Sequence, residues 1–165
     1  MEAGASRHPM ASPNTLNIWT RLSGSAAGRW LFSQLLCFKA PYFRSIAPRF
    51  KALAPSHCVV HVRKRRAVLN HIGTVHAIAM CNAAELAGGV MTEVTIPASV
   101  RWIPRGMTVE YLKKATTNVT ATARPMNPAF DWAVAGEYPV DVSVTDDGGE
   151  PVFKAIISMW VSPKK

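Results

Sequence analysis

Residues 70–89 read Asn-His-Ile-Gly-Thr-Val-His-Ala-Ile-Ala-Met-Cys-Asn-Ala-Ala-Glu-Leu-Ala-Gly-Gly, and the architecture can be worked out from this segment. Its many small residues predict one helix from about Thr74 to Ala87. The pair Gly88-Gly89 predicts the end of that helix, because glycine is common just past a helix C-terminus. A helix lined with alanine is thin, so a curved sheet can wrap closely around it.

Strand-like segments follow the helix, with hydrophobic and polar residues in two-residue alternation. They are residues 107–112, 118–123, 140–145 and 152–161. The turn sequence Asp146-Asp147-Gly148-Gly149 predicts a hairpin between the last two. A further strand is expected at 57–66, before the helix. This order predicts an α+β fold in which an antiparallel β-sheet packs against one central α-helix.

The N-terminal region shows a broken helical pattern. Leu16, Trp19 and Leu22 have helical spacing, and residues 29–39 predict a second short helix that Pro41 ends. We therefore expect two or three short helices that pack on the rest of the fold.

The chain is expected to form one domain. Its 165 residues suit a single core, and 48% of them are hydrophobic, which argues against wholesale disorder. We expect residues 1–13 to form a flexible tail, residues 14–52 an N-terminal helical extension and residues 53–165 the core of the fold. No stretch reaches the roughly 18 apolar residues of a membrane span, and the first dozen residues lack the pattern of a secretory signal.

The three cysteines, Cys37, Cys58 and Cys81, contain no CxxC pair. Their odd number and wide spacing argue against a disulfide framework and a structural zinc site. The histidine spacing completes no ligand set, so no metal is expected. A reducing, cytoplasmic compartment fits this cysteine usage best.

Positive charge is concentrated near the N-terminus. Residues 1–66 hold 11 Lys or Arg and one acid, Glu2, which gives 11 − 1 = +10, whereas residues 67–165 hold 8 Lys or Arg and 9 acids, which gives −1. Such an asymmetry is typical of proteins that meet nucleic acid, an anionic membrane surface or a phosphorylated ligand.

Glu85 is the strongest candidate for chemistry, since it is the only acid between Glu2 and Glu93. It lies among alanines and leucine on a helix that should be largely buried, and a buried carboxylate is costly unless it is paired or functional. The alternative is that Glu85 lies at an exposed helix end near Gly88 and only keeps the helix soluble.

The amide of Ala77 is the second candidate, because free amides in the first turn of a helix can stabilise an oxyanion. Glu85 follows eight residues later, about 12 Å along the axis at 1.5 Å per residue. One carbonyl cannot easily touch both groups of one helix. Two antiparallel helices from two subunits would bring them together, so joint action of Ala77 and Glu85 predicts a two-fold dimer.

Three motifs resemble a known family. Gly73 to Glu85 is similar to the helix motif of the PaaI-like hotdog thioesterases. A closer resemblance is to the domain-of-unknown-function 4442 proteins, which share Asn-His-x-Gly-Thr-x-His-Ala, Ala-Glu-Leu-Ala-Gly-Gly and Arg-Trp-Ile-Pro-x-Gly-Met-x-Val-x-Tyr. These motifs lie here at 70–77, 84–89 and 101–111. The resemblance covers roughly residues 14–163 and implies a hotdog fold, with extra short N-terminal helices.

The resemblance also implies a site and an activity. It makes Glu85 the family's acid, Asn70 its asparagine, His76 its histidine and Ala77 the oxyanion amide of an acyl-CoA thioesterase. It implies no cofactor other than coenzyme A within the substrate, and a homodimer or a dimer of dimers.

The PaaI-like motif has two glycines where this chain has Ala77 and Ile78. The side chain of Ile78 should narrow the entry to the site. A non-catalytic acyl-ligand binding or regulatory protein is therefore the alternative. A hotdog hydratase would need a catalytic Asp–His pair, and this sequence contains no matching signature. His71 and Gly73 complete the substrate-binding candidates of this motif, although the favoured interpretation of His71 is a satisfied core histidine.

The basic residues outside the helix motif are candidates for binding an anionic ligand or surface. Arg65 and Arg66, in the run 63–66, are candidates for coenzyme A phosphates, as are Lys113 and Lys114; the simpler interpretation of the run is a solvated strand end. We expect no nucleic-acid binding, because the run is short and has no interleaved aromatics. The N-terminal helices are either a lid over an acyl tunnel or a weak contact with an anionic membrane surface.

Overall fold

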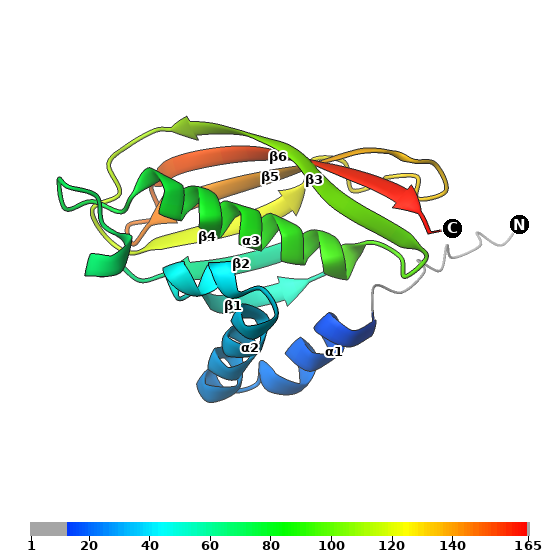
Figure 1. Ribbon diagram of the computed structural model, residues 1–165, viewed down its shortest axis with the longest axis horizontal. Helices are drawn as coiled ribbons and strands as arrows, with labels where there is room; N and C mark the ends of the chain where they lie inside the picture. The colour runs from blue at the N-terminus through cyan, green and yellow to red at the C-terminus, as the bar shows by residue number, and fades with distance from the viewer. Residues whose placement is uncertain (1–12, 165) are drawn as a thin grey trace, which may run out of the picture.

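The computed structural model describes residues 13–164, which form a curved antiparallel sheet around one long helix (Figure 1). In chain order the elements are α1 (Pro13–Leu22), α2 (Ala26–Lys39), the 3-10 helix η1 (Pro41–Ile46), β1 (Arg49–Ala54), β2 (His57–Val62), the 3-10 helix η2 (Arg66–Val68), α3 (Ala77–Thr95), β3 (Val100–Tyr111), β4 (Val119–Pro125), β5 (Gly136–Asp146) and β6 (Pro151–Pro163). The predicted α+β architecture is confirmed. The expected tail, 1–13, lies outside the described residues except for Pro13, which begins α1.

The six strands follow the order β1-β2-β4-β5-β6-β3, and all neighbours are antiparallel. β1 and β3 are therefore the edge strands. β3 pairs with β6 along its whole length, from Val100 opposite Pro163 to Tyr111 opposite Phe153. Within the described chain the other edge of β3 has no partner strand, and after Val100 its residues are exposed or only half-buried.

Helix α3 runs through Gly88 and Gly89 and ends at Thr95, so the predicted stop at the glycine pair was wrong. The glycines serve packing instead. A Cβ on Gly88 would come 2.7 Å from Ile157 Cδ1, and one on Gly89 would come 3.2 Å from the Trp102 ring. Because glycine has no side chain, the helix can approach the sheet at Gly88 and Trp102 at Gly89.

The N-terminal helices dock on the first strand through aromatic rings and one hydroxyl. Trp19, Phe32 and Phe50 form a cluster, with ring centroids 5.1 Å apart for Trp19–Phe32 and for Phe32–Phe50. The buried Ser33 hydroxyl accepts a hydrogen bond from the Phe50 amide at 3.1 Å. α1 and α2 confirm the expected short helices. None of the helices in residues 13–164 is long and apolar enough to cross a membrane.

Strand β1 was not expected, because residues 49–52 were assigned to the helical extension. A register irregularity between Phe50 and Ala52 interrupts the two-residue alternation. The buried residues Phe50 and Leu53 are consequently three apart, a spacing that is typical of a helix.

The basic run 63–66 was predicted to lie within a strand, but it lies after one. β2 ends at Val62, so Arg63, Lys64 and Arg65 follow the strand instead of extending it. The Lys64 amide donates to Asn118 Oδ1 at 2.9 Å, a side-chain acceptor just before β4, in place of a strand partner.

The C-terminal hairpin forms as expected. Asp146 Oδ1 accepts from the amides of Gly148 and Glu150, both at 2.9 Å, and Gly149 has the positive φ of 82° that the turn requires.

Candidate functional site

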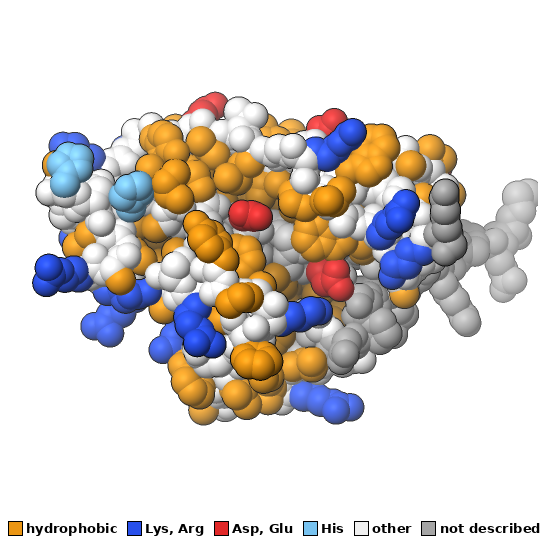
Figure 2. Space-filling view, in the orientation of Figure 1, with side chains coloured by type: hydrophobic (Ala, Val, Ile, Leu, Met, Phe, Trp, Pro, Cys, Tyr) orange, Lys and Arg blue, Asp and Glu red, His pale blue; other side chains and the backbone are white. Residues whose placement is uncertain are grey.

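Glu85 lies in the middle of α3 and points outward, while Ala84 and Leu86 on either side of it are buried. Both sequence interpretations therefore need correction: the carboxylate is exposed, and it is not at a helix end. Acidic side chains on this face stand among hydrophobic ones (Figure 2). Within the described residues no Lys or Arg forms an ion pair with Glu85.

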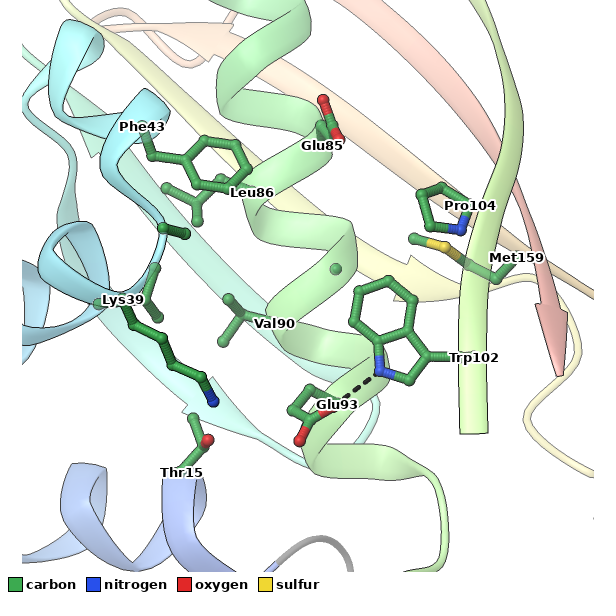
Figure 3. Close-up of a pocket in the computed structure, with 13 residues that line it drawn as sticks. Thr15, Lys39, Phe43, Glu85, Leu86, Val90, Glu93, Trp102, Pro104 and Met159 are labelled. Atoms are coloured by element: carbon green, nitrogen blue, oxygen red, sulfur yellow. Dashed lines mark hydrogen bonds between the residues drawn. The ribbon is translucent and has the colours of Figure 1, made fainter. Parts of the chain in front are cut away.

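The Glu85 carboxylate borders an apolar pocket of about 360 Å³ between α3, α2, η1 and β3. Leu36, Phe43, Val90 and Met159 are among its lining residues. Figure 3 shows Glu85 at one end of this pocket and the indole of Trp102 toward the other. An acid at the edge of an apolar pocket can act on a bond whose hydrocarbon substituent fills the pocket.

The far end of the same pocket is organised by Trp102. Its indole N–H donates to Glu93 Oε2 at 2.7 Å, and its ring covers Gly89. Lys39 of α2 lines the pocket across from Glu93 (Figure 3). Trp102 is half-buried and forms part of the pocket wall.

The start of α3 presents one free amide. His76 is the N-cap, and its Nδ1 accepts a hydrogen bond from the Ile78 amide at 3.0 Å. The His76 amide itself donates to Val68 O at 2.8 Å. In the described part of the chain the Ala77 amide meets no acceptor. The free Ala77 N–H therefore lies at the positive end of the helix dipole, where a backbone donor can stabilise an oxyanion.

Asn70 shapes the loop that leads into α3. Its Oδ1 accepts from the amides of Ile72 and Thr74, both at 3.1 Å, and its Nδ2 donates to Thr74 Oγ1 at 2.8 Å. One Nδ2 proton is left without a partner among the described residues. Gly73 has a φ of 77°, so its role in the loop is conformational: a side chain there would be strained.

Asn70 and Ala77 share an open hollow of about 460 Å³ with Tyr111, Lys113 and Lys114. Glu85 is absent from the lining of that hollow, and Ala77 and Asn70 are absent from the pocket of Glu85. His76 and Ile78 border a third hollow of about 180 Å³ beside η1. A single chain therefore does not bring the acid and the free amide to one place.

The four candidate phosphate ligands divide into two pairs. Arg65 Nη2 donates to Ser45 O at 2.7 Å and so fastens η1 to the loop after β2. Lys113 forms an ion pair with Glu150 at 2.7 Å, and this hydrogen bond raises the pKa of Lys113. Arg66 and Lys114 are exposed and form no ion pair within the described residues. Of the four candidates, Arg66 and Lys114 are therefore the two that can bind an anion.

His71 is exposed at the tip of the loop, so its assignment as a core histidine was wrong. Ile78 is 55% exposed and stands at the mouth of the η1 hollow.

The family model described as "Domain of unknown function (DUF4442)" matches residues 28–161. The chain belongs to this family. A crystal structure of the structural-genomics target APC5556 has 50% identity and a TM-score of 0.79, covering 91% of this chain and 98% of that one. A search of curated protein sequences found no match.

Two more distant structures establish the fold of this DUF4442 chain. Thioesterase HI1161 from Haemophilus influenzae has 12% identity and a TM-score of 0.68, covering 78% of this chain and 87% of that one. A mutant of the phenylacetic acid degradation protein PaaI from Thermus thermophilus has 19% identity and a TM-score of 0.62, covering 73% of this chain and 97% of that one. The predicted hotdog fold and the resemblance to the DUF4442 branch are confirmed.

Cys81 and Tyr111 were not singled out from the sequence, although they adjoin the site of this DUF4442 chain. Cys81 lies four residues from both Ala77 and Glu85, so all three share one face of α3. Its Sγ is 3.6 Å from the Tyr111 hydroxyl, and this hydrogen bond raises the pKa of Tyr111. The four-residue spacing was a readable signal for Cys81, whereas Tyr111 reaches the helix from a separate strand.

Proposed function

We propose that the protein is a hydrolase of acyl-CoA or a related acyl thioester. The observation that carries this proposal is the unpaired carboxylate of Glu85, at the edge of an apolar pocket and on the same face of α3 as the free Ala77 amide. The names of the structural neighbours support it. HI1161 is called a thioesterase, and PA5026 from Pseudomonas aeruginosa, at 20% identity and a TM-score of 0.69, is called a probable thioesterase.

The complete site requires a second copy of the chain, in a homodimer. The edge of β3 is open in one chain and carries the exposed side chains of Ile103, Met107 and Tyr111. Antiparallel pairing of two β3 edges about a two-fold axis would continue the sheet and cover these side chains. The same axis makes the two α3 helices antiparallel, so the start of one helix faces the middle of the other.

In this dimer the thioester carbonyl oxygen accepts a hydrogen bond from Ala77 N–H of one subunit, and Glu85 of the other takes a proton from water. The resulting hydroxide attacks the carbonyl carbon. The tetrahedral intermediate then collapses with cleavage of the C–S bond, and Glu85 returns its proton to the departing sulfur. Direct attack by Glu85, giving an anhydride that water hydrolyses, uses the same groups.

The remaining residues hold the substrate. The pocket lined by Leu36, Phe43 and Met159 takes the acyl group, and the free Nδ2 proton of Asn70 orients the carbonyl or the attacking water. Arg66 and Lys114 are the cations available to the phosphates of coenzyme A.

Thiol release from short, medium, long and aromatic acyl-CoAs tests the proposal. Wild type should turn over at least one of them, and Glu85→Gln should lower kcat by at least about 10²-fold, the scale of a positioned acid or base. Glu137→Gln, which removes an exposed acid on β5, is the matched control and should leave kcat unchanged. A Glu85→Gln enzyme that retains the wild-type rate would remove Glu85 from the mechanism.

Ile78 favours a second candidate function, a non-catalytic acyl-ligand binding protein. The exposed Ile78 side chain stands where the related motif has a glycine, directly after the residue that carries the free amide, and this departure from the hydrolase motif favours binding without turnover. Calorimetric titration with the same acyl-CoAs separates the two functions. Saturable binding without thiol release would favour the second candidate, and thiol release would exclude it.

A further inference from the structure

Helix α2 carries large hydrophobic side chains on the face that points away from the protein. Leu31, Leu35 and Phe38 repeat at helical spacing, with Trp30 beside them, and all four are exposed; Phe38 is 80% exposed. The inward face of α2 is complete without them, since Phe32, Ser33 and Cys37 are buried against the fold. Tyr42 of η1 extends the exposed hydrophobic surface. Folding of this chain therefore does not account for the outer stripe.

The surroundings of this stripe are positively charged. No Asp or Glu occurs in residues 13–84, while the same residues contain ten Lys or Arg. Lys39 and Arg44 follow the stripe along the chain, and Arg49 and Lys51 lie on the edge strand β1 next to which α2 packs; all four are exposed. Figure 2 shows hydrophobic side chains gathered over α2, with Lys and Arg along their borders.

We propose that α2 and η1 form a docking surface for an anionic lipid bilayer. Leu31, Leu35 and Phe38 enter the boundary between headgroups and acyl chains, and the bordering cations bind lipid phosphates and carboxylates. An apolar stripe that contains Trp and lies within a purely basic segment matches this surface, because aromatic rings favour the membrane interface and cations favour anionic headgroups.

The docked helix also belongs to the candidate site. Leu36 and Lys39, on the same helix, line the pocket that Glu85 borders. Docking therefore places that pocket close to the lipid surface. The docking itself does not depend on the proposed hydrolysis, so the two proposals can fail separately.

Vesicle flotation of the full-length protein tests the docking surface. Wild type should float with phosphatidylcholine vesicles that contain phosphatidylserine, should not float with phosphatidylcholine alone, and should be released by high salt. Leu31→Ser/Phe38→Ser should weaken the apparent vesicle affinity by about tenfold or more, because two large apolar side chains no longer insert. Arg44→Gln/Arg49→Gln should reduce binding to the anionic vesicles as well.

Val134→Ser/Ile156→Ser, which removes two exposed hydrophobic side chains far from α2 in sequence, is the matched control and should float like wild type. Circular dichroism and thiol release from soluble acyl-CoA should be unchanged in all these variants. Absence of flotation in wild type, or equal flotation of Leu31→Ser/Phe38→Ser, overturns the proposal. Loss of the dimer in that variant, or capture of an acidic protein in place of vesicles, overturns it too, since the face would then bind protein.

Discussion

At the level of single residues, the proposed hydrolysis depends on the pair formed by the Glu85 carboxylate and the Ala77 amide. The residues next to each group are either buried or already hydrogen-bonded. Leu86 and Ala84 are buried beside Glu85, and the Ile78 amide beside Ala77 is bound by His76 Nδ1. Within the described residues the Glu85 carboxylate forms no ion pair and the Ala77 amide meets no acceptor.

Ala77→Pro isolates the role of the amide. Proline is tolerated at the first position of a helix, and His76 before it already has the extended backbone, φ −63° and ψ 139°, that precedes proline. The variant should fold normally yet lose about 10²-fold or more in kcat, because its oxyanion donor is gone. Ala77→Ser, which keeps the N–H, is the control. Equal rates for Ala77→Pro and wild type would contradict the assignment.

Glu85 and Ala77 could be proposed from the sequence because both belong to one short segment with a fixed helical rise. The sequence did not place Glu93 and Trp102 at the pocket end, since their hydrogen bond joins a helix to a strand and leaves no local pattern. It could not anticipate that Arg65 and Lys113 are engaged by Ser45 O and Glu150, for the same reason.

At the scale of elements, helix α3 is held by its cap and by its two glycines. His76→Ala removes the side chain that accepts from the Ile78 amide and should cost about 1 kcal/mol of unfolding free energy. His76→Asn retains a capping acceptor and should restore both stability and most of the turnover. Chemical denaturation and thiol release measure the two effects. If His76→Asn is as inactive as His76→Ala while being stable, the imidazole takes part in the chemistry.

Gly88→Val tests the packing of α3 on the sheet. A Cβ at this position already meets Ile157 Cδ1 at 2.7 Å and lies 3.5 Å from Val140, and a branched side chain adds two further carbons. The variant should lose roughly 1–3 kcal/mol of unfolding free energy, the usual cost of overpacking. Gly88→Ala should lose less, because Ile157 can yield at the end of its side chain. A thermal midpoint of Gly88→Val equal to that of wild type would contradict close packing here.

These glycines explain why the end of α3 was predicted too early. A Gly-Gly pair can end a helix, or it can let a helix pack closely against its neighbours. The positions of Ile157 and Trp102, which the sequence does not reveal, decide between the two. The irregularity between Phe50 and Ala52 concealed β1 in a similar way. Regular strands such as β4 and β5 were predictable, since their buried residues alternate without interruption.

At the scale of the whole molecule, the basic segment 13–84, which contains no Asp or Glu, adjoins a sheet in which the outer edge of β3 has no partner strand within the described residues. We propose a separate role for each feature: the segment binds an anionic surface, and the edge binds a second copy of the chain. Glu85 and Ala77 lie about 12 Å apart along the axis of one helix, so the proposed hydrolysis requires a second copy of the chain.

Complementation between two inactive variants tests whether two subunits share one site. Glu85→Gln and Ala77→Pro are unfolded together, refolded as a mixture, and assayed for thiol release. Random pairing makes half of the dimers mixed, and each mixed dimer contains one intact site of two, so the mixture should recover about a quarter of the wild-type activity. A mixture no more active than the separate variants, with mixed dimers shown to be present, would contradict a site shared between subunits.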